Sequence, residues 1–168
     1  MKNLLKYTNA NVRITDTKTG CLLFTDSNLF VDAGREFIAD TLRNAIDGGG
    51  FIDSTKYVCD LGDNSQTPVV TDTDLIGTVL ANIAITGIPT VLVGESTGLN
   101  FQFVYAAGAL TTIREFGLFY RPISDVFPTR GSVPASMTGT LLARLRTTLS
   151  AITVGASQSI TIDWKIIF

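Results

Sequence analysis

Apolar and polar residues alternate most clearly at the end of the chain, in residues 159–168. The apolar members of this segment are spaced two apart: Ile160, Ile162, Trp164, Ile166 and Phe168. A period of two predicts a β-strand with one face in a core, so Trp164 is expected to be buried. This strand therefore ties the end of the chain into a sheet.

Shorter segments with the same period, or with apolar residues on both faces, predict further strands. Residues 11–24 indicate two strands around a turn, since residues 16–20 are of the kinds that turns favour. The other predicted strands occupy residues 56–61, 100–106, 111–121 and 141–149. The pattern in 111–121 predicts one continuous strand that is apolar on both faces.

One segment has helical spacing instead. Its apolar residues, all within 33–47, fall on one helical face: Phe37, Ile38, Leu42, Ala45 and Ile46. Asp32 is a candidate N-cap, and the glycines at 48–50 are expected to end the helix. The apolar stripe is expected to face a core.

These elements together indicate a mainly β protein, an antiparallel β-sandwich of a jelly-roll-like kind with one packed α-helix. The 168 residues suit a single domain, 1–168, that is large enough to bury a sizeable core. Residues 122–139 contain three prolines with several Ser, Thr and Gly. This composition predicts a long surface loop.

The composition is apolar for a soluble monomer, with 45% hydrophobic and 17% charged residues. We expect the surplus apolar surface to be buried against other protein chains in a permanent assembly. No apolar run approaches the roughly 20 residues that a membrane-spanning helix needs. Residues 1–12 show no secretory hydrophobic region, and a membrane partner is not expected.

The net charge of −2 comes without any run of Lys or Arg. Proteins that bind nucleic acid usually show such a basic footprint, so no nucleic-acid partner is expected. Cys21 and Cys59 have the spacing of neither a zinc site nor a redox motif. Both lie in apolar surroundings, which favours two buried free thiols over a disulfide.

The chain has no histidine. This matters for residues 94–98, GESTG, which match the nucleophile elbow of serine hydrolases around Ser96. In that mechanism a histidine accepts the serine proton, and nothing near Ser96 offers a lysine in its place. We therefore interpret the segment as a glycine-flanked loop, and expect no enzymatic activity and no cofactor.

Three aspartates, Asp63, Asp72 and Asp74, are the candidates for a metal site. An EF-hand loop needs oxygen ligands at positions 1, 3 and 5 and a glutamate at position 12. Counted from Asp72, position 5 is Ile76 and position 12 is Ile83, and neither side chain offers an oxygen. Asp72, or the threonine before it, precedes an apolar run and is expected to cap a short helical turn. The alternative is a cation site helped by Asp63 or by a neighbouring subunit.

Glu115 and Arg144 each lie within an apolar segment that is predicted to be a strand. A buried charge needs a partner, and the planar guanidinium of arginine suits a carboxylate. We predict that Glu115 pairs with Arg144 or Arg146 across neighbouring strands, and that the pair fixes the register more than it adds stability. The alternative is that Glu115 lies on an exposed edge.

Several motifs together resemble those of small structural proteins of tailed bacteriophages. They are a helix that begins NLFVDAGREF, a TPxxTDTxL segment after a Gly/Asp turn, an EFGLF strand, an LLAR strand and the closing strand, at residues 28–42, 61–75, 115–119, 141–145 and 159–168. The resemblance covers most of the chain from Asn28 onward. The 122–139 loop is longer than in the simplest versions of this pattern.

This resemblance implies a virion protein of the tail, neck or fibre type, without enzymatic activity. Such a subunit would assemble with itself and with neighbouring tail, neck or capsid proteins through apolar and strand-edge contacts. Its N-terminal strands or the 122–139 loop are expected to touch other chains. The alternative is a lectin-like module on a fibre or baseplate that binds host carbohydrate, with Tyr120, Phe127 and Arg130 as the candidates for its contacts.

Overall fold

The computed structural model of the chain describes residues 9–46, 56–87, 89–92, 98–121, 139–147 and 151–167. Within them the helix is α1 (Asp32–Ile46). The strands are, in chain order, β1 (Asn9–Asp16), β2 (Leu22–Phe30), β3 (Tyr57–Gly62), β4 (Val79–Ala84), β5 (Thr90–Leu92), β6 (Gly98–Ala106), β7 (Thr111–Ile113), β8 (Glu115–Tyr120), β9 (Thr140–Arg146), β10 (Ile152–Val154) and β11 (Ser159–Ile167).

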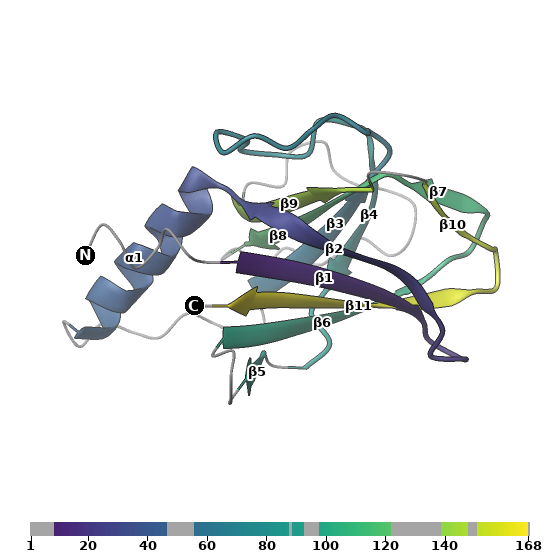
Figure 1. Cartoon of the computed structure of the whole chain (residues 1–168), viewed down its shortest axis with the longest axis horizontal. Helices are drawn as coiled ribbons and strands as arrows, with labels where there is room; N and C mark the ends of the chain where they lie inside the picture. Colours follow the sequence, from purple (N-terminus) through teal and green to yellow (C-terminus); the bar gives the residue numbers. More distant parts are fainter. Residues whose placement is uncertain are drawn as a thin grey trace.

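Nine of these described strands form one sheet, in the order β4-β3-β8-β9-β2-β1-β11-β6-β5, and β7 pairs with β10 in a separate ribbon. Every neighbouring pair is antiparallel. The sheet folds over at β2, which pairs first with β1 and then, through Leu29 and Phe30, with β9. In Figure 1, β1, β11 and β6 lie in front of β8 and β3.

We call β2, β1, β11, β6 and β5 the first layer, and β9, β8, β3 and β4 the second layer. Buried side chains of both layers form one core: Phe101, Phe103, Ile162 and Trp164 from the first, and Leu61, Phe116 and Leu118 from the second. The layers meet again where the N–H of Thr86 donates to the carbonyl oxygen of Gln102 (2.7 Å). The predicted mainly β, sandwich-like fold with one packed helix is confirmed for the described residues.

The prediction of one strand over 111–121 is wrong, because the chain changes sheets at Arg114. β7, before it, pairs with β10, whereas β8, after it, belongs to the second layer. The backbone N–H of Arg114 donates to the oxygen of Gly62 (2.9 Å), and its carbonyl oxygen accepts the N–H of Thr147 (2.8 Å). Both bonds tie Arg114 to the second layer, beside the start of β8, and Arg114 itself belongs to neither strand.

The helix is close to its predicted bounds, and it packs against β9. The N–H of Arg35 donates to the oxygen of Val31 (3.1 Å), so Val31 takes the cap position and Asp32 is the first helical residue. The expectation that Asp32 caps the helix is therefore wrong by one residue, and its carboxylate instead pairs with Arg35 (2.8 Å). Gly34 allows the backbone of the helix to approach that of β9 closely, since a Cβ on Gly34 would overlap the carbonyl oxygen of Leu142.

The two cysteines have opposite environments. Cys59 is buried in β3, and burial raises the pKa of its thiol well above the usual value, which keeps it in the unreactive protonated form. Cys21 is exposed in the turn between β1 and β2, so the prediction of two buried thiols is wrong for it. Its apolar sequence neighbours Leu22 and Leu23 are exposed as well, because this end of the hairpin extends beyond the core. Both thiols are free.

The outer faces of the two layers differ. Burial alternates along β11 of the first layer, as one solvent-exposed face requires. In the second layer, β3 is buried along its whole length, and β8 and β9 along nearly all of theirs. Residues 63–78, which we call the connector because they join β3 to β4, arch over β9 at the top of Figure 1. The connector packs on this face together with Val31 and Ala33 at the start of α1, whereas Phe37 and Ile38 of the helix pack against the main core.

No helix in the described part of the chain is long and apolar enough to cross a membrane.

Candidate functional site

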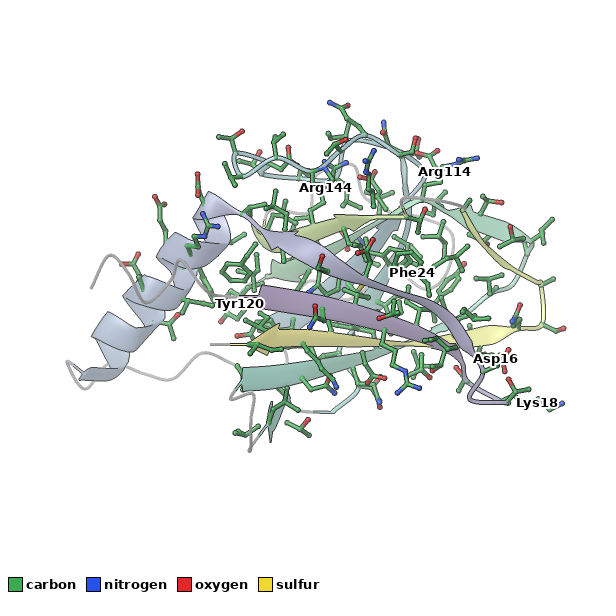
Figure 2. All side chains as sticks on the ribbon, viewed as in Figure 1. Asp16, Lys18, Phe24, Arg114, Tyr120 and Arg144 are labelled. Atoms are coloured by element: carbon green, nitrogen blue, oxygen red, sulfur yellow. The ribbon has the colours of Figure 1, made fainter. Side chains whose placement is uncertain are left out.

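The connector is held on the second layer by one arginine and two carboxylates. Arg144 of β9 donates from Nε (3.0 Å) and Nη2 (2.7 Å) to Oε2 of Glu115 in β8, and from Nη1 to Oδ2 of Asp72 in the connector (2.7 Å). The side chains of Arg144 and Glu115 are fully buried, and that of Asp72 is 9% exposed. We call these three residues the Arg144 cluster; Figure 2 labels Arg144 beneath the connector. The predicted pair between Glu115 and Arg144 is present.

Backbone groups of the connector complete the cluster. Oε1 of Glu115 accepts the N–H of Gly77 (2.7 Å), and Nη2 of Arg144 donates to the carbonyl oxygen of Gln66 (3.3 Å). Each charged side chain of the sheet thus bonds both to the other one and to the connector. This matters because buried ions are stable only when partners replace the water they have lost.

Three glycines that were not predicted from the sequence to matter allow close packing around the connector, and one of them, Gly62, makes room for the cluster itself. A Cβ on Gly62 would lie 2.5 Å from Oε1 of Glu115, and one on Gly117 would lie 2.8 Å from a methyl carbon of Leu75. A Cβ on Gly77 would overlap the carboxylate of Asp63. Their place beside predicted strands and turns is a weak signal, because glycine in such segments marks close approaches of many kinds.

The aspartates of the connector satisfy its own backbone. Oδ2 of Asp72 accepts the N–H of Val69 (2.9 Å), Oδ1 of Asp74 accepts the N–H of Leu75 (2.8 Å), and Oδ1 of Asp63 accepts the N–H of Thr78 (2.8 Å). The expectation of a capped helical turn is wrong, since residues 63–78, all described, contain no helix. Carboxylates, three of the connector's own and Glu115 from the sheet, take the bonds that a helical turn would have made.

The cation alternative would need oxygens that other groups already use. Oδ2 of Asp72 is shared between Arg144 and the N–H of Val69. Across the described residues, no group of three or more His, Cys, Asp or Glu side chains is arranged to hold a metal ion.

A second buried ion pair, which was not predicted from the sequence, lies in the second layer. Arg121 donates from Nη1 (2.9 Å) and Nη2 (2.6 Å) to the two carboxylate oxygens of Asp60, and Asn82 donates to Oδ1 (2.6 Å). The guanidinium lies 4.5 Å from the centre of the Phe119 ring. The available signal was Asp60 itself, a charge inside the apolar segment 56–61.

Of the three carbohydrate candidates, the structure describes Tyr120 alone. Tyr120 packs inside, with its ring centre 4.7 Å from that of Phe37 and 5.4 Å from that of Tyr57. Phe127 and Arg130 lie outside the described residues, as does the 122–139 loop except for Gly139. Ser96 of the GESTG motif lies outside them too.

A shallow depression of about 450 Å³ lies at the far end of the first layer, where two turns meet. Its lining is polar: Asp16, Thr17, Lys18, Ser157, Gln158 and Ser159. Oδ2 of Asp16 accepts a bond from Nε2 of Gln158 (2.8 Å), and Oδ1 accepts the N–H of Thr19 (2.7 Å). These bonds lower the pKa of Asp16 to about 2, and the bond from Gln158 has the largest effect. The carboxylate therefore serves to fasten the two turns to each other.

Large apolar side chains are exposed at several places on the described surface. They are Leu22, Leu23, Val69, Val70, Ile76, Val91, Val104 and Leu110. Val69, Val70 and Ile76 belong to the connector, and Val91 lies on the edge strand β5 with 67% of its surface exposed. The connector thus turns more large apolar side chains outward than inward.

The geometry defines a class of architecture, an antiparallel β-sandwich-like domain with one helix and a pinned connector. A scan of family models and searches of curated proteins and solved structures found no match to the chain.

Proposed function

We propose that this chain is a non-enzymatic structural subunit that assembles with itself and with neighbouring proteins of a bacteriophage virion. The observation that carries the structural role is the connector, which exposes Val69, Val70 and Ile76 while buried ionic bonds pin its backbone. Exposed apolar groups on a fixed backbone lose little conformational entropy when another protein covers them. Such preorganisation is what a permanent protein contact needs.

The sheet edges support the same role. β4 and β5 end the nine-stranded sheet of the described residues, and Val91 of β5 is exposed there. A sheet edge with an outward apolar residue favours pairing with another chain, because its backbone groups can continue the ladder. The assignment to a virion rests on the resemblance of sequence motifs, which lie in α1 and the residues before it, in the connector, and in β8, β9 and β11.

The test of the structural role is the mass of the purified chain in solution over a range of concentrations, together with two substitutions. Val69→Asp on the connector and Val91→Asp on β5 are each expected to raise the concentration needed for half-assembly by about 10-fold or more, since a buried charge without a partner opposes the contact. Thr71→Asp is the matched control: it adds the same charge to an exposed connector position and is expected to change assembly little.

A wild-type chain that stays monomeric at every concentration, alone and with particle proteins, would contradict the structural role. The virion assignment has its own test, which is mass spectrometry of purified particles for peptides of this chain. A glycan array with the same sample separates the carbohydrate-binding alternative.

A further inference from the structure

The connector is attached to the rest of the molecule mainly through charged side chains, besides one backbone bond from the N–H of Asp32 to the carbonyl oxygen of Val70 (2.8 Å). Asp72 binds Arg144 (2.7 Å), and Glu115 accepts the N–H groups of Gly77 (2.7 Å) and Ile76 (3.4 Å). Arg146 adds a bond to the carbonyl oxygen of Ser65 (3.2 Å). Buried ionic contacts of this kind contribute little net stability, because the desolvation of the ions offsets most of their attraction.

The apolar contribution of the connector is small. Leu75 is its one buried side chain, counted over residues 63–78, all of which the structure describes. Leu75 packs with Val31, Phe119 and Leu141 in a small cluster that is separate from the main core. One buried leucine contributes far less transfer free energy than the many buried side chains of the main core.

The sandwich keeps its main interactions without the connector. The main core cluster contains no residue of 63–78. The ladders between β3, β8 and β9 also form without it. Loss of the connector's contacts would therefore leave the two layers paired and the main core filled.

We propose that the connector opens as one unit while the sandwich stays folded, and that the Arg144 cluster sets how often it opens. A segment with few buried apolar contacts opens at a lower free energy than the core around it. Opening uncovers Phe119 and Leu141 beside Arg144, on the outer face of β8 and β9. The inference goes beyond the assembly role, since it concerns the single chain in dilute solution. The closed connector is the major form and the one that a partner would cover, and the open form is the minor one.

Hydrogen exchange of the dilute full-length chain, with low concentrations of denaturant added, tests this directly. The N–H groups of Val69 and Gly77 report on the connector, because their acceptors are Asp72 and Glu115. Ladder N–H groups of β1 and β11 report on the sandwich. We expect the connector groups to exchange faster than those of β11, with a weaker dependence on denaturant.

Asp72→Asn removes the ionic contact with Arg144 and keeps the size of the side chain. It is expected to speed exchange at Val69 and Gly77 by about 10-fold or more, the range of a lost charge-assisted hydrogen bond, and to leave β11 unchanged. The matched control is Asp74→Asn, which makes the same change on the same segment but at a carboxylate bonded to the neighbouring Leu75 N–H. It is expected to change exchange less than about 2-fold.

A further variant, Leu75→Ala, removes the apolar attachment and is expected to speed exchange at the same connector groups. The proposal is overturned if Val69 and Gly77 exchange with the rate and denaturant dependence of β11, which would mean that the connector opens only when the whole domain unfolds. It is also overturned if Asp74→Asn matches Asp72→Asn, since the Arg144 contact would then not be the determinant.

Discussion

The two layers of the sandwich differ in how their strands are buried, on one face or on both. In the first layer, β11 turns Ile162 and Trp164 into the core and leaves residues such as Asp163 at the surface, where it accepts bonds from Gln102 (3.0 Å) and Asn100 (3.4 Å). In the second layer, the face turned away from the core is buried as well. Its charged residues must therefore find partners inside the protein, because water no longer reaches them.

The difference shows how one sandwich can combine an outer face that tolerates substitution of its charged residues with an outer face that does not. A surface charge keeps its solvation when it is replaced or when its neighbour is removed. A charge in the second layer depends on specific partners from distant segments, and the loss of one partner leaves the others buried and unpaired. Substitutions on the two outer faces should thus differ strongly in effect.

The largest expected effect is that of Arg144→Met. It should lower the free energy of unfolding by about 3–5 kcal/mol, because Glu115 and Asp72 lose their cation. The matched change in the first layer is Arg13→Met, at an exposed position of β1, and it should change the free energy of unfolding by less than about 0.5 kcal/mol. Urea unfolding of both variants measures the contrast.

The double variant Glu115→Gln with Arg144→Met tests whether Glu115 and Arg144 act as a unit. It should recover part of the loss, since the buried carboxylate beside the missing cation is then neutral. Additive effects of the two substitutions would contradict the view that the pair acts as a unit.

Gly117→Ala should have the next largest effect, a loss of about 1–3 kcal/mol from overpacking against Phe119 and Leu75. Gly155→Ala is its control, because a Cβ there would make only ordinary contacts with Gln158. Thermal unfolding of the two variants measures the difference. Equal effects would show that the outer face of β8 is not tightly packed.

Tyr57 of the second layer should make the free energy of unfolding fall as the pH rises into the alkaline range. Burial, and then the nearby charge of Tyr120, raise the pKa of Tyr57 from 10.0 to about 12. The neutral ring is thus favoured in the folded state, so this contribution is complete below about pH 10 and is lost as the pH rises through about 12. Tyr57→Phe should remove that part of the pH dependence, as measured by unfolding and by phenolate absorbance.

Asp16, at the exposed end of the first layer, should have the smallest effect and the opposite sign. Its pKa is lowered from 3.8 to about 2 by the bond from Gln158 and then by the bonds from Thr19. The ionised form is favoured in the folded state, so the contribution is present above about pH 3.8 and is lost as the pH falls through about 2. Asp16→Asn should reduce the fall in the free energy of unfolding between about pH 4 and pH 2, as measured by urea unfolding at each pH. An unchanged fall would contradict this.

Much of the first layer was readable from local pattern. Alternation in residues 159–168 correctly predicted β11 and the burial of Trp164. In the second layer, the charge of Glu115 inside an apolar segment correctly indicated an ion pair with Arg144. These inferences succeeded because periodicity and isolated charges reflect the immediate environment of each residue.

Other features depend on how distant segments meet. Asp72 lies 72 positions from Arg144, and Asp60 lies 61 positions from Arg121. Nothing in its local sequence distinguishes Asp72 from the exposed Asp74, which stands in the same threonine-rich run. Asp60 stands out as a charge inside an apolar segment, but the local sequence does not indicate Arg121 as its partner. The break at Arg114 was equally invisible, since β7 and β8 read as one apolar segment.

The chain's own pattern thus settles where the helix lies and where several strands lie, β11 above all, because these follow from short-range spacing and from the avoidance of water by apolar groups. It did not indicate β4 or β10, and it did not separate β7 from β8. Only the folded arrangement decides that the connector covers β8 and β9, and that one arginine serves two carboxylates. An ionic contact of this kind depends on distances of a few ångströms between remote residues, and folding alone brings those residues together.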